Sequence, residues 1–275
     1  ILSMAKAPAA EIAPVLQRAV AARPQAVTPR LALVRLYLQE NDKRAALKAA
    51  QDAAAALRDD PRVLDALGRA QLAAGESNQA IETYNRLVTL QPQSSQPLVR
   101  LAAVYGSLKD RDKAIDVLLR AQKLAPADPV IARELALGYL MQGKADRAIA
   151  QAEALQAVAP KSDDGFVLEG DVYTAARQWV PAERAYRAAL KAEPASGVAA
   201  AKLYGVLVAA NRKADAEALS RKWVSDHPAD AGFRMYVAEQ ALRTRDFKSA
   251  ASHYQAIIAQ QPDNVVALNN LAWTA

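Results

Sequence analysis

The sequence of 275 residues contains no cysteine, only two histidines and only 5% aromatic residues. Without cysteine the chain has no disulfide, no thiolate metal ligand and no cysteine nucleophile. The two histidines, His227 and His253, lie on different predicted segments, and no partner stands at the spacing that a zinc site requires. Few aromatic residues and only ten glycines disfavour a β-sandwich or barrel, whereas the abundant alanine favours helices.

The sequence also has only a small excess of charge of one sign and no long apolar run. The 35 basic and 29 acidic residues leave a net charge of +6, with no basic run and no interleaving of basic and aromatic residues, so nucleic acid is not an expected partner. No run of about 18 apolar residues could span a bilayer. The chain opens without an initiator methionine and stops inside an apolar-periodic segment, so we expect it to be a piece of a longer protein.

What the sequence does contain is a period of 34 residues. Six prolines follow one another at this interval, and two further steps back from the first of them reach Arg58 and then Pro24. Alanines in the same register form an unbroken series. The prolines are Pro92, Pro126, Pro160, Pro194, Pro228 and Pro262, and the alanines are Ala46, Ala80, Ala114, Ala148, Ala182, Ala216 and Ala250. A period of this length indicates a repeat protein.

Each period has the pattern of two helices. In residues 95–128, apolar side chains recur at helical spacing before and after a break at 107–110. At the equivalent breaks stand Asn41, Gly75, Gly143 and Asn211, which suit the left-handed residue that ends a helix. Pro181 falls in the first turn of a second helix, where proline is tolerated. The register prolines then end each pair.

Small residues recur in the first helix of each pair, and aromatic residues often recur in the second. We expect the small residues where two antiparallel backbones approach closely and the large ones where a gap opens. Gly68 and Gly170 represent the first class, and Tyr84 and Tyr186 the second. Four positions depart from the pattern, namely Arg58, Glu169, Tyr204 and Ser220. Trp223 stands at a helix-packing position and is expected to fill the core.

This pattern resembles the tetratricopeptide repeat, a helix–turn–helix unit of 34 residues. The resemblance implies an all-α fold, a right-handed superhelical solenoid of helix–turn–helix repeats. We expect residues 1–26 to hold the second helix of a truncated leading unit and 265–275 to start a truncated eighth unit. Seven full units would occupy 27–264, with the boundaries 27–60, 61–94, 95–128, 129–162, 163–196, 197–230 and 231–264.

A finer resemblance rests on five segments: 166–173, 201–204, 214–219, 223–228 and 269–273. They are similar to segments of PrsT-type tetratricopeptide lipoproteins of PEP-CTERM/exosortase sorting and exopolysaccharide systems in Gram-negative bacteria. The resemblance implies an extracytoplasmic location, periplasmic or membrane-anchored, with a lipid anchor outside this sequence. A cytoplasmic location stays open.

Stacked repeats of this kind expose a groove lined by their first helices, so we expect a non-enzymatic scaffold that binds a protein or peptide ligand there. By register, the groove is expected to run from basic through apolar to acidic, which would orient a bound segment. A solvated face without a ligand is the alternative. The predicted groove residues are Arg35, Arg62, Asp65, Arg69, Val99, Ala103, Arg133, Leu137, Met141, Val167, Asp171, Met235 and Glu239.

Several other signals weigh against catalysis and cofactors. Residues 138–145 nearly match a phosphate-binding loop, but Ala145 stands where a hydroxyl is needed, and no strand precedes the segment. The carboxylate pairs 59–60 and 163–164 fall at unit junctions, where they can cap helices. We therefore expect no catalytic, cofactor or metal site. A cytosolic assembly scaffold and a glycan-binding solenoid of an exopolysaccharide secretion system remain the alternative functions.

Overall fold

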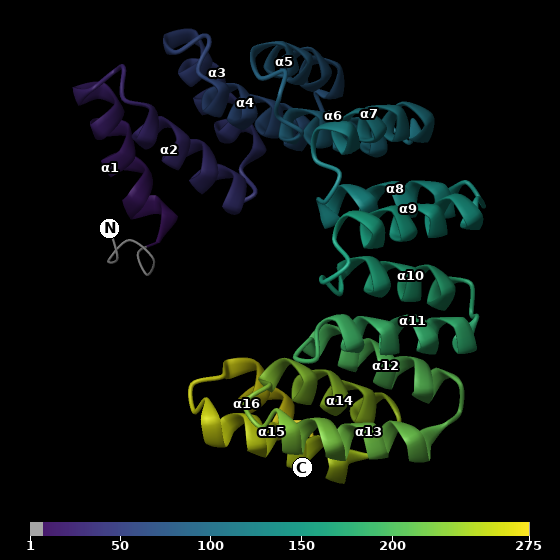
Figure 1. Cartoon of the computed structure of the whole chain (residues 1–275). Coiled ribbons are helices and arrows are strands. Elements are labelled where there is room, and N and C mark those ends of the chain that lie inside the picture. The colour runs from purple at the N-terminus through teal and green to yellow at the C-terminus, as the bar shows by residue number, and fades with distance from the viewer. Residues whose placement is uncertain (1–7, 275) are drawn as a thin grey trace. The chain divides into compact units, whose positions relative to one another are not determined.

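The computed structural model describes residues 8–274, which fold into helices joined by short turns, with no strand in that range (Figure 1). The described residues form two compact units that divide between Pro126 and Ala127. The predicted fold class is confirmed, because the chain is an all-α solenoid of helical repeats. The outermost positions, 1–7 and 275, lie outside the described residues, so the expectations about the two ends of the chain fall partly on them.

The helices are mostly of similar length, 12 to 14 residues. The first unit contains α1 (Ala9–Ala22), α2 (Val27–Gln39), α3 (Lys43–Ala56), α4 (Pro61–Ala74), α5 (Ser77–Leu90), α6 (Gln96–Ser107) and α7 (Arg111–Leu124). The second unit contains α8 (Pro129–Met141), α9 (Ala145–Val158), α10 (Asp164–Ala175), α11 (Trp179–Ala192), α12 (Gly197–Ala209), α13 (Lys213–Asp226), α14 (Ala231–Arg243), α15 (Phe247–Gln260) and the shorter α16 (Val265–Ala272).

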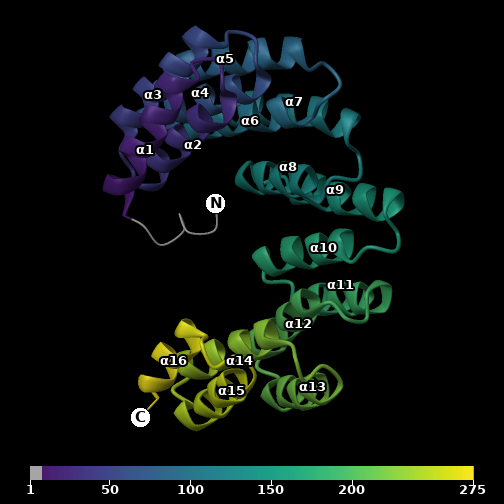
Figure 2. The ribbon, with the colours of Figure 1, turned by 90° about the vertical axis from the view of Figure 1, so that its left-hand side faces the viewer.

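Successive helices lie side by side within each unit (Figures 1 and 2). The even-numbered helices also contact one another, α2 with α4 in the first unit, and α8 with α10 and α12 with α14 in the second. A row of even-numbered helices therefore forms one face of the stack in each unit. The register prolines all lie in the turns that follow the odd-numbered helices, as the sequence predicts.

The turn inside each helical pair contains a residue in the left-handed region. Asn41, Gly75, Gly143 and Asn211 have φ angles of 56°, 84°, 73° and 60°, so the four predicted positions are confirmed. At the residue immediately before the next helix, the backbone N–H closes a six-residue ring and satisfies a free carbonyl of the preceding helix. An example is the N–H of Glu76, which donates to the carbonyl of Gln71 at 2.8 Å.

Three further turns adopt the same conformation with residues that residue type alone does not suggest. Lys109, Arg177 and Arg245 stand at the same register position and have φ angles of 60°, 56° and 59°. The ring-closing hydrogen bond recurs there, for example from the N–H of Gln178 to the carbonyl of Tyr173 at 2.9 Å. The repeat therefore imposes this turn even where a side chain makes it costly.

In the pairs α4–α5 and α10–α11, the core between the helices matches one small residue with one large one. All alanines of the constant series are fully buried except Ala114. A Cβ added to Gly68 would lie 2.5 Å from Cζ of Tyr84, and one added to Gly170 would collide with the Tyr186 ring in the same way. These glycines leave the space through which the tyrosines of the neighbouring helix pass.

In the pair α12–α13 the large and the small residue stand at exchanged register positions. Tyr204 stands at the register position of Gly68 and Gly170, and Ser220 stands at the position of the tyrosines. Both are buried, at 9% and 7% exposure. The ring of Tyr204 packs edge-on against Phe233 and Tyr236 of α14. Trp223 is buried beside them in the same core, as predicted.

The left-handed turn at Arg177 predicts a gain in stability from glycine. Arg177→Gly removes the steric cost of a side chain at positive φ, and should raise the free energy of unfolding by about 0.5–1 kcal/mol after the loss of backbone entropy. Arg184→Gly, in the exposed interior of α11, is the matched control and should lower it by about 1 kcal/mol. Denaturant unfolding of the two variants measures the difference, and equal losses would contradict the left-handed assignment.

The exchange between Tyr204 and Ser220 predicts coupled effects on stability. Tyr204→Ala should cost about 3 kcal/mol through the cavity it leaves, and Ser220→Tyr about 1–3 kcal/mol through overpacking. The double variant restores one large and one small residue, so its cost should be at least about 1 kcal/mol below the sum of the two single costs. Additive costs in thermal and denaturant unfolding would show that the two positions are independent.

Candidate functional site

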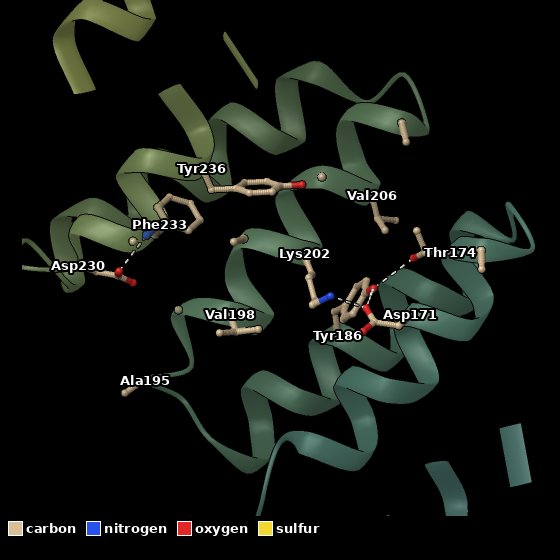
Figure 3. A pocket seen from close by; sticks show the side chains of 16 residues that line it. Asp171, Thr174, Tyr186, Ala195, Val198, Lys202, Val206, Asp230, Phe233 and Tyr236 are labelled. Atoms are coloured by element: carbon tan, nitrogen blue, oxygen red, sulfur yellow. Dashed lines mark hydrogen bonds and ion pairs between the residues drawn. The ribbon is translucent and has the colours of Figure 1, made fainter. Parts of the chain in front are cut away.

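The second unit has an open groove of about 920 Å³ over α12 (Figure 3). Its floor is α12, one wall comes from the C-terminal half of α10, and the other comes from the N-terminal half of α14. Tyr186 of α11 lines the same groove from the side of the core. The lining residues are Asp171, Thr174, Ala175, Tyr186, Ala195, Gly197, Val198, Ala201, Lys202, Gly205, Val206, Ala209, Asp230, Gly232, Phe233 and Tyr236.

The floor of the groove is almost bare of long side chains. Gly197, Ala201, Gly205 and Ala209 follow one another at four-residue intervals, which places them along one side of α12. The space above Gly205 is used, because a Cβ there would collide with the hydroxyl of Tyr236. Small residues on α12 therefore open the groove, and Gly205 also allows the Tyr236 side chain of α14 to extend over α12.

An ion pair with a tyrosine forms the polar centre of the groove. Lys202 Nζ lies 2.6 Å from Asp171 Oδ1, and the hydroxyl of Tyr186 donates to the same oxygen at 2.7 Å (Figure 3). With its proton committed to the carboxylate, the Tyr186 hydroxyl accepts from Thr174 Oγ1 at 3.2 Å. Tyr186 reaches this position only because Gly170 leaves room for its ring. The tyrosine thus anchors Asp171 from inside the core.

Burial raises the pKa of Tyr186 well above its ordinary value of 10, and the negative charge of Asp171 raises it further. The hydroxyl therefore stays protonated and acts as a hydrogen-bond donor at every physiological pH. Asp171 and Lys202 are each about one-third exposed, so their mutual attraction is screened by solvent. The pair sets the position of charge in the groove more than it stabilises the fold.

Asp230 closes the other end of the groove. As the N-cap of α14, it accepts a hydrogen bond from the N–H of Phe233 through Oδ1 at 2.9 Å. Its Oδ2 accepts from Nε1 of Trp223, also at 2.9 Å. The indole of Trp223 stacks on His227, with ring centroids 4.1 Å apart, and packs against Phe233. The carboxylate is therefore held rigidly, and no basic side chain pairs with it within residues 8–274.

The first unit carries a smaller version of this arrangement. Asp65 pairs with Arg69 at 3.0 Å and with Arg100 of α6 at 3.1 Å, beside a cleft of about 210 Å³. Tyr84 and Arg100 stand three periods before Tyr186 and Lys202 in the sequence. In both units, a tyrosine from the second helix thus lies close to an aspartate of the first helix and a basic residue of the next pair.

The structure separates the predicted groove residues. Only Asp171 lines the large groove, whereas Arg62, Asp65 and Arg69 line the small cleft of the first unit. Arg35 borders a further hollow between α1 and α2. The remaining members lie along the even-numbered helices outside these three cavities, and they are Val99, Ala103, Arg133, Leu137, Met141, Val167, Met235 and Glu239.

Two details differ from the sequence-based expectation. Val167 is only 4% exposed and belongs to the core, so it offers no binding surface. Two of the arginines expected to attract an acidic ligand already have acidic partners, Arg62 with Asp60 at 2.7 Å and Arg69 with Asp65. Arg35 and Arg133 are exposed and form no ion pair within residues 8–274. The expected charge gradient involves both units and stays a prediction.

Sequence reasoning missed most of the large groove, including Lys202, Tyr236 and Thr174. The register contained one usable signal, since Arg100 and Lys202 are equivalent and each follows a pair with a tyrosine. Within residues 8–274 the acidic and histidine side chains form no cluster that could hold a metal ion. Among the helices of this range, none combines the length and the apolar character that crossing a bilayer requires.

Comparison with known families finds one model, described as tetratricopeptide repeat. It matches residues 31–95, 66–129 and 206–265, which together make up more than half of the chain. A search of curated proteins finds no match.

Solved structures of the same kind share the fold. The C-terminal part of a TPR repeat-containing protein from Cytophaga hutchinsonii is 15% identical with a TM-score of 0.55, covering 96% of this chain and 94% of that one. A tetratricopeptide repeat protein from Parabacteroides merdae is 16% identical with a TM-score of 0.52, covering 89% and 97%. PilF of Pseudomonas aeruginosa is 17% identical with a TM-score of 0.50, covering 76% and 96%.

The raised pKa of Tyr186 predicts a change in alkaline stability. Above pH about 10 the unfolded chain loses the tyrosine proton while the native state retains it, so native stability falls as pH rises. Tyr186→Phe should reduce the slope of this fall by up to about 1.4 kcal/mol per pH unit. Denaturant unfolding at several values between neutral and strongly alkaline pH measures the slope. Equal slopes in the two proteins would contradict the pKa shift.

Proposed function

Because the chain belongs to the tetratricopeptide repeat family, whose fold generally mediates protein–protein interactions, we propose that it is a non-enzymatic scaffold that binds a segment of another protein in the groove over α12. The observation that carries this proposal is the groove itself. Its volume of about 920 Å³ lies at the upper end of the range of ligand sites, and a few convergent polar groups interrupt an apolar lining.

Exposed apolar surface on the groove floor supports the same proposal. Val198 lines the groove and is 60% exposed, and Ala201 and Gly205 further along α12 are only partly covered. Covering this surface with a partner's apolar side chains would release water from it at a gain of about 25 cal/mol per Å². The ion pair of Asp171 and Lys202 would set the orientation of the bound segment.

We retain the remaining predicted residues as secondary contacts. Arg62, Asp65 and Arg69 are proposed to contact a partner at the cleft of the first unit, with Arg35 and Arg133 as exposed cations available for an acidic segment. Exposed apolar side chains on α8 support an extension of the surface, because Leu137 and Met141 are 50% and 56% exposed. The other proposed contacts are Val99, Ala103, Met235 and Glu239.

The resemblance to PrsT-type lipoproteins supports a more specific role, in PEP-CTERM/exosortase sorting or exopolysaccharide export. Seven repeat units over 27–264 are the proposed building blocks of the scaffold. A cytosolic assembly scaffold is the alternative if the complete protein lacks a lipid-attachment signal. A glycan-binding solenoid is a second alternative. It predicts that adding the exopolysaccharide raises the melting temperature of the protein.

Val198→Glu tests the groove as the protein-binding site. A carboxylate on the apolar floor should weaken binding at least about tenfold, because the complex must remove water from it and the nearest cation, Lys202, is already paired with Asp171. Val198 is exposed in the free chain, so the variant should fold normally. The measurement is capture of sorting or export proteins from a cell-envelope extract of the native host.

Val180→Glu is the matched control. Val180 is 76% exposed on α11 and does not line the groove, so the same change of residue there should leave capture unaffected. Equal capture by both variants and the original chain would exclude the groove as the binding site.

A further inference from the structure

We infer that the groove over α12 is built for an amphipathic α-helix that carries a basic side chain, and not for an extended peptide. This inference rests on the proposed function and specifies the partner of the same site. It follows from the hydrogen-bonding capacity of the floor, from its shape and from its charge.

Apart from Lys202, whose ammonium group is already paired with Asp171, the floor offers an extended peptide no polar side chain. The side chains of Val198, Ala201 and Val206 have no polar atom, and the glycines have no side chain. The backbone groups of α12 are already committed to their own helix. An extended segment presents a free N–H and a free C=O at every residue, and burying them without partners is costly. An α-helix satisfies these groups internally and can lie on such a floor without loss.

The dimensions of the floor also fit a helix. Ala201 and Ala209 on one side of α12 leave room for a second helix to approach, and the path is bordered by Asp230 over Gly197 and by the Tyr236 hydroxyl over Gly205. The 13 residues of α12 extend over about 20 Å, the length of a partner helix of about the same number of residues. Phe233 and Tyr236 on one wall and Ala175 on the other border this path.

The other common modes of peptide recognition lack their structural requirements here. Strand addition needs a free sheet edge, and residues 8–274 contain no strand. Polyproline recognition needs several exposed aromatic rings, but Tyr186 and Phe233 are each only 1% exposed, which leaves Tyr236. Recognition of acidic motifs needs a basic cluster, and the one cation that lines the groove, Lys202, is already paired with Asp171. Helix-in-groove binding is the mode that remains.

The charge of the groove favours a basic side chain on that helix. Three charged residues line the groove, and since Lys202 balances Asp171, the negative charge of Asp230 is left over. Asp230 is fixed by Trp223 and by the N–H of Phe233, so it cannot turn away from a ligand. A lysine or arginine at the edge of the partner's apolar face would meet this carboxylate, whereas an acidic residue there would be repelled.

Selection from a displayed library of random peptides of about 16 residues, roughly 24 Å long as helices, tests the inference without a known partner. The bait is the full 275-residue chain. A selected peptide is classed as groove-dependent when it binds the Val180→Glu variant of the chain but not the Val198→Glu variant. We expect these peptides to carry apolar residues at i, i+3, i+4 and i+7, with lysine or arginine enriched beside them. Their helicity, followed by circular dichroism, should rise on binding.

Two altered versions of the strongest groove-dependent peptide complete the test. A central proline, which breaks the helix, should weaken binding at least about tenfold, and so should replacement of its basic residue by glutamate. Groove-dependent peptides with alternating apolar residues, or with affinity unchanged by the proline, would overturn the helix inference and leave the proposed function standing. If no selected peptide distinguishes Val198→Glu from Val180→Glu, the proposed function and this inference both fail.

Discussion

Close packing between the two helices of a pair is the constraint on which the rest of this structure depends. In two pairs a tyrosine of the second helix faces a glycine of the first, because a larger residue there would overlap with the ring. These are Tyr84 over Gly68 and Tyr186 over Gly170. In α12–α13 the aromatic residue, Tyr204, belongs to the first helix, and its ring packs against Phe233 and Tyr236 of α14.

This packing rule shapes the chemistry of the groove. Since the tyrosine of α11 passes over Gly170, its hydroxyl emerges beside Asp171 and fixes the carboxylate to which Lys202 binds. On the next pair, the aromatic ring of Tyr204 belongs to α12 itself and lies in the core, so α12 contributes no aromatic side chain to the groove. A floor without aromatic residues is therefore a consequence of how the core is filled.

The periodicity of the sequence predicted the helices and their breaks, because spacing and turn chemistry are local properties of the chain. It also predicted the left-handed turns at glycine and asparagine, but not those at Lys109, Arg177 and Arg245, where the repeat overrides residue preference. Of the predicted groove residues, only Asp171 lines the large groove. The lining comes from three first helices and one second helix, and register within a single helix does not reveal which side chains converge across them.

The sequence by itself determined the repeat length, the all-α class and the positions of the turns, since each of these follows from residues near one another along the chain. Only the tertiary structure decided that Val167 is buried, that Arg100 of the next pair joins Asp65, and that Lys202 and Tyr186 meet at Asp171. These outcomes depend on contacts between different helices. Such contacts are set by the relative sizes of the side chains that face each other across the helices, and spacing along a single helix does not contain that information.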